Sequence, residues 1–503
     1  MNRKAIPFKK LAIAGSVSLA LTACAPEFDD SVKDITFKPG SADFSTYVAV
    51  GDSLTAGYAD GALYLDGQKH SFPALLAGSL AKAGGGAFSQ PLVADNNGGL
   101  LLGGNKIAET RLVLGLVNGK QSPKRLDADP TTDIANPVDD MPNNMGVPGA
   151  KSFHLGAPGY GALAGVQAGT ANPYFVRFAS SDTATVIGDA VAQQPSFFTL
   201  WIGNNDVLFY ATSGGDGEDQ TGNIDPTSYG PDDITDPNVF AATYQQMLTA
   251  LKSAGGKGVL LTIPDVTDIP YFTTVPWNPV PLDQANADAL NAAYAAYNGG
   301  IQQALANNLI DADEAAARTI SFAPGQNPVV IEDEDLTDLS ALNLPSIRQT
   351  TADDLLVLTA GSRIGTLADE DDPNSAWGVG TPLEDGDVLI KSERDAIANA
   401  TAAYNATIKN LADADDDLAL VDVNGLMSQV ASANGYSFGT GQVTATFGSG
   451  GAFSLDGIHP TQRGYALITN AVIDAIESQF GATLPRVEPM EYPTIFLDPN
   501  GPS

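Results

Sequence analysis

The stretch TYVAVGDSLTAGYADG, residues 46–61, decides the fold and raises a question about one serine. Residues 46–50 form a short apolar run typical of a buried strand, and Gly51-Asp52-Ser53-Leu54 interrupts it. A serine at such a strand-to-helix turn either caps the following helix or acts as a nucleophile. A base, an orienting carboxylate and oxyanion donors elsewhere in the chain would favour the nucleophile.

Strands and helices alternate along much of the remaining chain. Continuous apolar runs, typical of strands buried on both faces, occupy 196–203, 258–265 and 418–423. Apolar residues at helical spacing predict helices over 71–85, 238–254, 391–411 and 463–480. This alternation predicts an α/β protein whose parallel sheet is covered by helices on both faces.

Three regions interrupt the alternation. Residues 86–143 are rich in glycine and asparagine and are interpreted as long loops. Residues 266–390 form a large insertion with a helical run near 282–308. The segment 214–233 offers many oxygen ligands but lacks the spacing of a calcium EF-loop, so we interpret it as a solvated loop and leave cation binding open.

The charge of the chain limits its partners. It contains 25 Lys and Arg against 59 Asp and Glu, a formal net charge of −34. Nucleic-acid binding requires a basic surface, so nucleic acid is excluded as an expected partner. The same balance disfavours anionic polymers as substrates.

The first residues are typical of a targeting segment. Arg3, Lys4, Lys9 and Lys10 precede the apolar core Leu11–Leu21, which is too short to span a bilayer but suits a signal peptide. The sequence LTAC that ends at Cys24 resembles a bacterial lipobox, and Cys24 is the only cysteine of the chain. We therefore predict a signal peptide over 1–23, lipidation of Cys24 and a polar tether over 24–44.

The predicted lipid anchor places the protein in the bacterial cell envelope, at the outer membrane. The acidic residues Glu27, Asp29 and Asp30 after the cysteine resemble export signals of surface lipoproteins of Bacteroidota. Ordinary linker composition explains them nearly as well, so exposure at the cell surface stays open.

One of the three histidines stands beside a carboxylate. His459 lies in FSLDGIHPTQRGYAL, residues 453–467, three residues after Asp456. A D-x-x-H turn allows the carboxylate to orient the imidazole while the other ring nitrogen takes a proton from a serine. We interpret the other two histidines, His70 and His154, as structural.

Two further loops offer oxyanion donors. PNNMGVPGAKS, residues 142–152, contains Gly149, whose backbone N–H can approach a substrate closely because no Cβ intervenes. IGNNDVL, residues 202–208, places Asn205 at the end of a predicted strand, where ligands of open α/β sheets bind. An Asx-turn that caps this loop is the alternative for Asn205.

These residues together resemble the GDSL, or SGNH, hydrolase family. Four family blocks occur in order: GDSL at 51–54, NMGVPG at 144–149, GNND at 203–206 and DGIHP at 456–460. The resemblance implies Ser53 as nucleophile, His459 as base and Asp456 as its orienting group. It also implies an oxyanion hole made by the Ser53 N–H, the Gly149 N–H and the Asn205 side chain.

The resemblance covers roughly residues 45–265 and 390–482 and implies a fold. The family fold is a three-layer α/β/α sandwich with a flavodoxin-like parallel sheet. We therefore expect a hydrolase domain over 45–482, interrupted by the insertion 266–390, and a C-terminal tail over 483–503. A competing nucleophile motif, GYSFG at 435–439, is rejected because no buried strand precedes it.

The insertion leaves the predicted sheet at the carboxyl end of a strand, where the site residues should meet. It carries the aromatic and proline-rich segment IPYFTTVPWNPVP, residues 269–281, which includes Trp277. We expect the insertion to line or cover the acyl site and to select chain length. A distal subdomain that only adds surface is the alternative.

The expected activity is that of a lipid-anchored serine ester hydrolase that needs neither cofactor nor metal. Its substrate is expected to be a small or lipid-like ester. A polysaccharide O-acetyl esterase of the same family is one alternative. A surface-binding lipoprotein without catalytic activity is a second alternative, which the retention of both Ser53 and His459 disfavours.

Overall fold

The structure, a computed structural model, describes residues 36–439 and 441–501. The chain divides into two units, Met1–Thr36 and Phe37–Ser503, and the elements below belong to the second. The predicted signal peptide and Cys24 lie outside the described residues. Within the described ranges, no helix is both long and apolar enough to cross a membrane.

A five-stranded parallel sheet forms the centre of the second unit, in the order β15-β8-β7-β1-β6. Its strands are β1 (Tyr47–Gly51), β6 (Asn144–Gly146), β7 (Phe197–Trp201), β8 (Lys257–Leu261) and β15 (Leu418–Val421). All residues of β1 and β7 are buried, as expected for strands covered on both faces. The predicted parallel sheet is confirmed.

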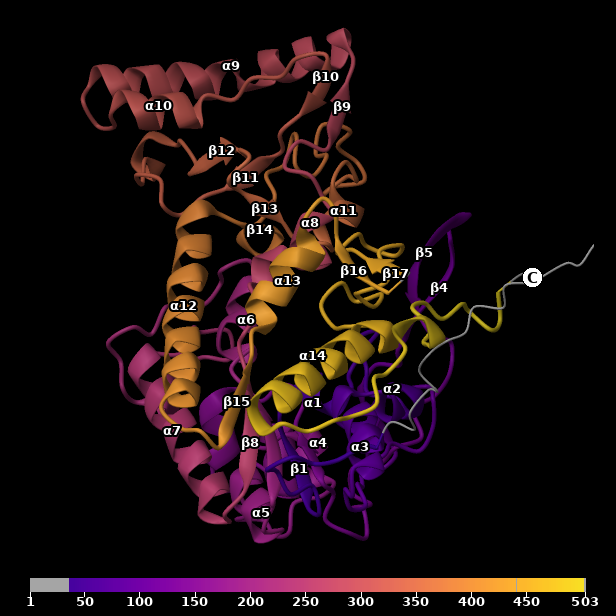
Figure 1. Ribbon diagram of the computed structural model, residues 1–503. Helices are drawn as coiled ribbons and strands as arrows, with labels where there is room; N and C mark the ends of the chain where they lie inside the picture. The colour runs from indigo at the N-terminus through magenta and orange to yellow at the C-terminus, as the bar shows by residue number, and fades with distance from the viewer. Residues whose placement is uncertain (1–35, 440, 502–503) are drawn as a thin grey trace, which may run out of the picture. The chain divides into compact units, whose positions relative to one another are not determined.

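Alternate side chains of β7 enter two different hydrophobic cores. Phe198 and Leu200 belong to the core that contains residues of α5, α7 and α12. Phe197 and Trp201 belong to the core on the opposite face, with residues of α3 and α14. These helices are α3 (Phe72–Lys82), α5 (Val186–Ala192), α7 (Pro237–Ser253), α12 (Lys391–Asp413) and α14 (Gln462–Phe480). The unit is therefore a three-layer α/β/α sandwich (Figure 1).

Side-chain caps fix where the predicted helices begin. The Ser71 hydroxyl caps α3 by accepting a hydrogen bond from the Ala74 N–H at 3.4 Å. Asp236 caps α7, and Thr461 caps α14 by accepting from the Gly464 N–H at 3.0 Å. Such caps satisfy backbone donors that the first helical turn leaves free. The last helix consequently starts immediately after the loop that carries His459.

The interpretation of residues 86–143 as long loops was wrong in part. They contain two antiparallel hairpins, β2 (Leu100–Leu102) with β3 (Asn105–Ala108) and β4 (Leu112–Val117) with β5 (Lys120–Arg125). The second hairpin turns at Asn118-Gly119, with φ angles of 52° and 77°. Asn-Gly is the preferred sequence of a two-residue hairpin turn, so this signal was present in the sequence.

Both ends of the described unit pack against other parts of it. Lys38 pairs with Thr483 through two backbone hydrogen bonds, and the buried ring of Phe44 lies 4.9 Å from that of Phe197. At the other end, the Leu114 N–H donates to the Phe496 carbonyl at 2.9 Å. Part of the segment predicted as a tether and part of the predicted tail are therefore packed against the rest of the second unit.

The insertion 266–390 has a core of its own, which includes Val329, Val330, Ile331, Leu356 and Leu383. The predicted helical run corresponds to α9 (Gln284–Ala306), which α10 (Ala312–Arg318) follows (Figure 1). Its other elements are short: α8 (Pro270–Thr273), β9 (Val280–Leu282), β10 (Gly325–Asn327), β11 (Val330–Glu332), β12 (Ile347–Gln349), β13 (Leu355–Leu356), α11 (Ala360–Arg363) and β14 (Val388–Leu389).

Candidate active site

The turn after β1 places Ser53 at the carboxyl end of the sheet, at the first position of α1 (Ser53–Ala56). Gly51 is required there, because a Cβ would lie 2.2 Å from the Trp201 carbonyl oxygen. Asp52 caps α1 by accepting from the Leu54 N–H at 2.9 Å, and its other oxygen accepts from the Asn204 amide at 2.8 Å. The peptide that precedes Ser53 is thus tied to the loop after β7.

Burial raises the pKa of Asp52 to about 6, against the opposing effect of its hydrogen bonds from Asn204 and Leu54. Asp52 is fully buried, so its carboxyl group contacts protein atoms and not bulk solvent. We assign it a positioning role for the nucleophile turn.

A continuous hydrogen-bond chain joins the three residues of the predicted triad. The Nε2 atom of His459 lies 2.9 Å from the Ser53 Oγ, and its Nδ1 lies 2.9 Å from Oδ2 of Asp456. Ser53 is 406 residues from His459 in sequence. The ring centroid of Tyr58 lies 4.7 Å from that of the imidazole, and the two rings are tilted by 49°. The structure therefore brings together the serine, the base and the carboxylate that the sequence singled out.

The Asp456 carboxylate is held by several further donors. Its Oδ1 accepts from the N–H groups of Ile458 and His459, both at 2.9 Å, and from the Ser454 hydroxyl at 3.1 Å. Its Oδ2 also accepts from the Gly61 N–H at 2.8 Å. Burial alone would raise the pKa of Asp456, but the neighbouring His459 and these hydrogen bonds lower it to about 2. The group is therefore ionised at neutral pH.

The candidate oxyanion donors come from the loops after β6 and β7. Gly149 adopts a φ of +81°, which favours glycine. The Asn205 side chain donates to the carbonyl of the adjacent Ala150 at 2.9 Å, so its amide is fixed against the Gly149 loop. In the part of the chain that the structure describes, neither the Ser53 N–H nor the Gly149 N–H donates to a protein acceptor. Both are available to a substrate oxygen.

Two buried aspartates that the sequence analysis did not identify hold loops around the candidate site. Asp206, next to Asn205, accepts from the Ser152 hydroxyl at 2.6 Å and from the Ser152 N–H at 2.8 Å. Asp60 accepts from the Leu455 N–H at 3.0 Å, and its own N–H donates to the Ser454 hydroxyl at 2.8 Å. Asp60 is 395 residues from Leu455, and no local pattern signals such a long-range contact.

The insertion contacts the loop that carries Asp456 and His459 directly. The N–H of Tyr271 donates to the carbonyl of Gly457, between Asp456 and His459, at 3.0 Å. A Cβ at Gly457 would lie 3.0 Å from Leu358 and 3.2 Å from the Tyr271 nitrogen, so the two segments are in close contact. Trp277 is half-buried, and its carbonyl accepts from the Thr350 hydroxyl at 2.6 Å within the insertion.

An apolar cavity of about 80 Å³ is lined by sequence neighbours of the candidate triad, but by none of its three residues. Leu54, which follows Ser53, lines it together with Ile458 and Pro460, which flank His459. Met427 of α13 (Val423–Ala431) lines another part of its wall. Ile269 contributes the part of the wall that belongs to the insertion.

The remaining candidates take no part in the hydrogen-bond chain of the triad. His70 follows α2 (Leu65–Lys69), and its Nδ1 lies 2.8 Å from the Asp66 carbonyl oxygen. His154 stacks on Tyr160 at 4.7 Å, and burial together with the Lys151 charge lowers its pKa to about 4. Ser437 of the rejected GYSFG motif is exposed on β16 (Tyr436–Phe438), a strand of a two-stranded antiparallel sheet.

The family model described as GDSL-like Lipase/Acylhydrolase matches residues 47–472. The chain belongs to this family. The match spans the four sequence blocks, all five strands of the sheet and the insertion. Membership indicates an esterase, a lipase or another acylhydrolase, and ester substrates. No curated protein and no solved structure matches the chain.

Proposed function

We propose that this GDSL-family protein is a serine ester hydrolase that works through an acyl-enzyme. The observation that carries the proposal is the chain Asp456–His459–Ser53, with both hydrogen-bonding distances at 2.9 Å. The ionised Asp456 fixes the tautomer in which Nδ1 carries the proton, so Nε2 is free to accept the Ser53 proton. The imidazolium that forms is stabilised by the adjacent carboxylate.

The reaction then follows from the positions of these groups. The Ser53 Oγ attacks the ester carbonyl as His459 takes its proton, and the tetrahedral intermediate collapses when His459 protonates the leaving alcohol. A water molecule, deprotonated by His459, next attacks the acyl-Ser53 carbonyl. The carboxylic acid leaves, and the proton returns to the Ser53 oxygen.

The three oxyanion candidates would stabilise the negative oxygen of each tetrahedral intermediate. The Ser53 and Gly149 N–H groups are free of protein acceptors within the described residues, and Asn205 has a second amide hydrogen beyond the one given to Ala150. Donors that are fixed before the reaction do not have to reorganise as charge develops. The hydrogen bonds of Asp52 and Asp206 support this fixed arrangement.

The apolar cavity lined by Leu54, Ile458 and Pro460, the sequence neighbours of Ser53 and His459, is the proposed acyl site. Its volume of about 80 Å³ is well below the roughly 300–1,000 Å³ of typical small-molecule pockets. This size favours short acyl groups. It also supports a second candidate function within the same chemistry, the removal of O-acetyl groups from a polysaccharide.

We also propose that lipidated Cys24 anchors the protein to the outer membrane of a bacterial envelope. The basic flank, the short apolar core and the LTAC sequence support this anchoring. Membrane fractionation of Cys24→Ser tests the proposal. The variant should be released to the soluble fraction, and retention in membranes would contradict a lipid anchor.

Hydrolysis of a graded series of p-nitrophenyl acyl esters, alongside acetate release from an acetylated glycan, tests the proposed activity. The protein should hydrolyse the shortest esters fastest, and Ser53→Ala should be inactive with an unchanged circular dichroism spectrum. Acetate release from the glycan at a higher kcat/KM than from any p-nitrophenyl ester would favour the O-acetyl esterase. No hydrolysis of any ester would favour the non-catalytic binding protein.

A further inference from the structure

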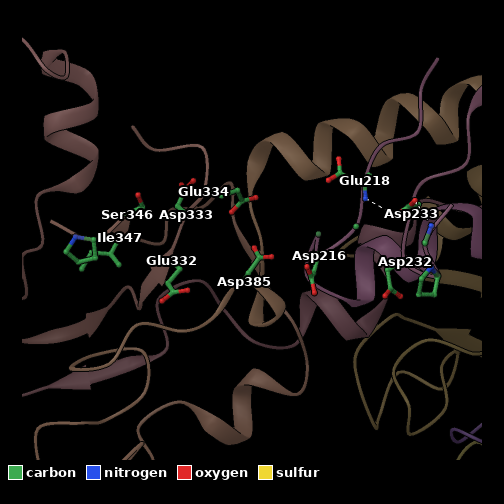
Figure 2. Close-up of a pocket in the computed structure, with 15 residues that line it drawn as sticks. Asp216, Glu218, Asp232, Asp233, Glu332, Asp333, Glu334, Ser346, Ile347 and Asp385 are labelled. Carbon is green, nitrogen blue, oxygen red and sulfur yellow. Dashed lines mark hydrogen bonds between the residues drawn. The ribbon is translucent and has the colours of Figure 1, made fainter. Parts of the chain in front are cut away.

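A large acidic pocket lies where the insertion meets the hydrolase unit (Figure 2). Its volume is about 750 Å³, and eight of its 15 lining residues are Asp or Glu, while none is Lys, Arg or His. Glu332, Asp333, Glu334 and Asp385 of the insertion form one wall, and Asp216 of the loop after α6 (Asn205–Thr212) faces Asp385. Such a pocket attracts cations and repels anionic ligands.

Three carboxylates converge at this junction. Oxygen atoms of Glu334, Asp385 and Glu393 all lie within 4.8 Å of one another. Glu334 and Asp385 come from the insertion, whereas Glu393 lies in the first turn of α12, outside it. Within the described ranges 36–439 and 441–501, none of the three forms an ion pair.

The Glu393 side chain gives a second, independent indication of a ligand. Glu393 is only 4% exposed. Its Oε2 accepts the Ile390 N–H at 2.7 Å and so completes the cap of α12, but its Oε1 is buried and has no hydrogen-bond partner among the described residues. An unpartnered buried carboxylate oxygen costs free energy, and a cation would satisfy it.

Gly215 makes room for this carboxylate. Gly215 has a φ of +90°, which favours glycine, and a Cβ there would lie 1.7 Å from the present position of Oε1 of Glu393, so the loop after α6 approaches this oxygen closely. On the other side, a Cβ at Gly214 would lie 2.4 Å from the carbonyl oxygen of Asp385. The loop, the insertion and α12 therefore meet around the three carboxylates.

We propose that Glu334, Asp385 and Glu393 bind a Ca²⁺ ion that joins the insertion to the hydrolase unit. Ca²⁺ prefers oxygen ligands at about 2.3–2.6 Å, so two ligands on opposite sides of the ion lie about 5 Å apart. Mg²⁺ has shorter bonds and requires a more regular octahedron, which suits this set less well. Water and backbone carbonyls of the loop complete the coordination.

The electrostatics of the cluster agree with this assignment. Oxygen atoms of the three carboxyl groups lie within 4.8 Å of one another, and no Lys, Arg or His lines the pocket. Three ionised carboxylates at this distance repel one another, and a divalent cation would relieve that repulsion.

Isothermal titration calorimetry of the full-length, chelator-treated protein with CaCl₂ tests the proposal. One Ca²⁺ per chain should bind, and the midpoint of thermal unfolding should rise with Ca²⁺ concentration. Glu334→Gln should weaken Ca²⁺ binding by at least about tenfold. Because Glu334 is exposed, this variant is expected to fold even if Glu393→Gln does not. Glu370→Gln, which removes an exposed acid elsewhere in the insertion, should bind Ca²⁺ like the wild type.

Several results would overturn the site. The absence of binding heat and of a thermal shift would mean that the carboxylates only share protons. An equal loss of Ca²⁺ binding in Glu370→Gln would mean that Ca²⁺ only screens the negative charge in general. An equal rise of the unfolding midpoint with NaCl of matched ionic strength would mean the same. Equal binding of Mg²⁺ would contradict the assignment to Ca²⁺. These measurements do not depend on ester hydrolysis, so failure of this site and failure of the proposed activity are distinguishable.

Discussion

Asparagine in place of Asp456 should reverse the hydrogen bond to His459 without removing the side chain. Oδ1 of Asp456 accepts from three donors, whereas Oδ2 accepts from the Gly61 N–H and faces Nδ1 of His459. The amide nitrogen of the introduced asparagine should therefore occupy the Oδ2 position, where fewer donors oppose it. It would donate to Nδ1, so the imidazole proton would lie on Nε2. A protonated Nε2 cannot accept the Ser53 proton.

The expected loss follows from this wrong tautomer. In serine hydrolases with the same triad arrangement, this change lowers kcat by about 10⁴, which corresponds to about 5 kcal/mol of transition-state stabilisation. The assay is kcat/KM for p-nitrophenyl acetate at pH 7.5, with Asp474→Asn, an exposed aspartate of α14, as the matched control. A folded Asp456→Asn variant that retains more than about a tenth of wild-type kcat/KM would refute the role of Asp456.

Three further predictions concern residues around the triad. Asn205→Ala should lower kcat by about 10²–10³, the usual loss for one oxyanion donor, whereas an unchanged kcat would reduce Asn205 to a loop cap. Asp60→Asn should flatten the pH dependence of the unfolding free energy. Burial raises the native pKa of Asp60 from 3.8 to about 6, so the native state holds a proton that the unfolded state releases. The unfolding free energy of the wild type should therefore fall by about 3 kcal/mol as pH rises from about 4 to about 6. Urea titrations that give the variant the same pH dependence of this free energy would contradict Asp60 as its cause. Ile269→Ala, which alters the part of the cavity wall that the insertion supplies, should change the ratio of kcat/KM between short and long acyl esters by roughly 1 kcal/mol per methylene, and an unchanged ratio would leave the insertion without a role in selection.

The sequence predicted the parallel sheet because its strands are continuous apolar runs. SFFTLWIG at 196–203 contains β7, and its alternate side chains fill the two cores. The edge strand β6 (Asn144–Gly146) was not predicted, because three residues are too few for a periodic signal. The hairpin at Asn118-Gly119 carried a recognisable turn signal but was obscured by the glycine-rich composition around it.

The candidate triad was predictable because each member lies in a short local motif. The residues that support it are not. Asp60 contacts the loop of Asp456 from 395 residues away, and Asp52 meets Asn204 only because β1 and β7 are neighbours in the sheet. The acidic junction also escaped prediction, since Glu334 and Glu393 lie 59 positions apart in segments without a ligand motif. Such contacts arise from tertiary packing, which local patterns do not encode.

Mass spectrometry of the protein after reaction with a fluorophosphonate tests the central claim most directly. The proposed mechanism predicts one covalent adduct on Ser53, and labelling should be much slower in His459→Ala, because the base that lies 2.9 Å from Oγ is then absent. An adduct on another serine, such as Ser437, or a Ser53 adduct that forms equally fast without His459, would contradict the assignment of Ser53 as a nucleophile activated by His459.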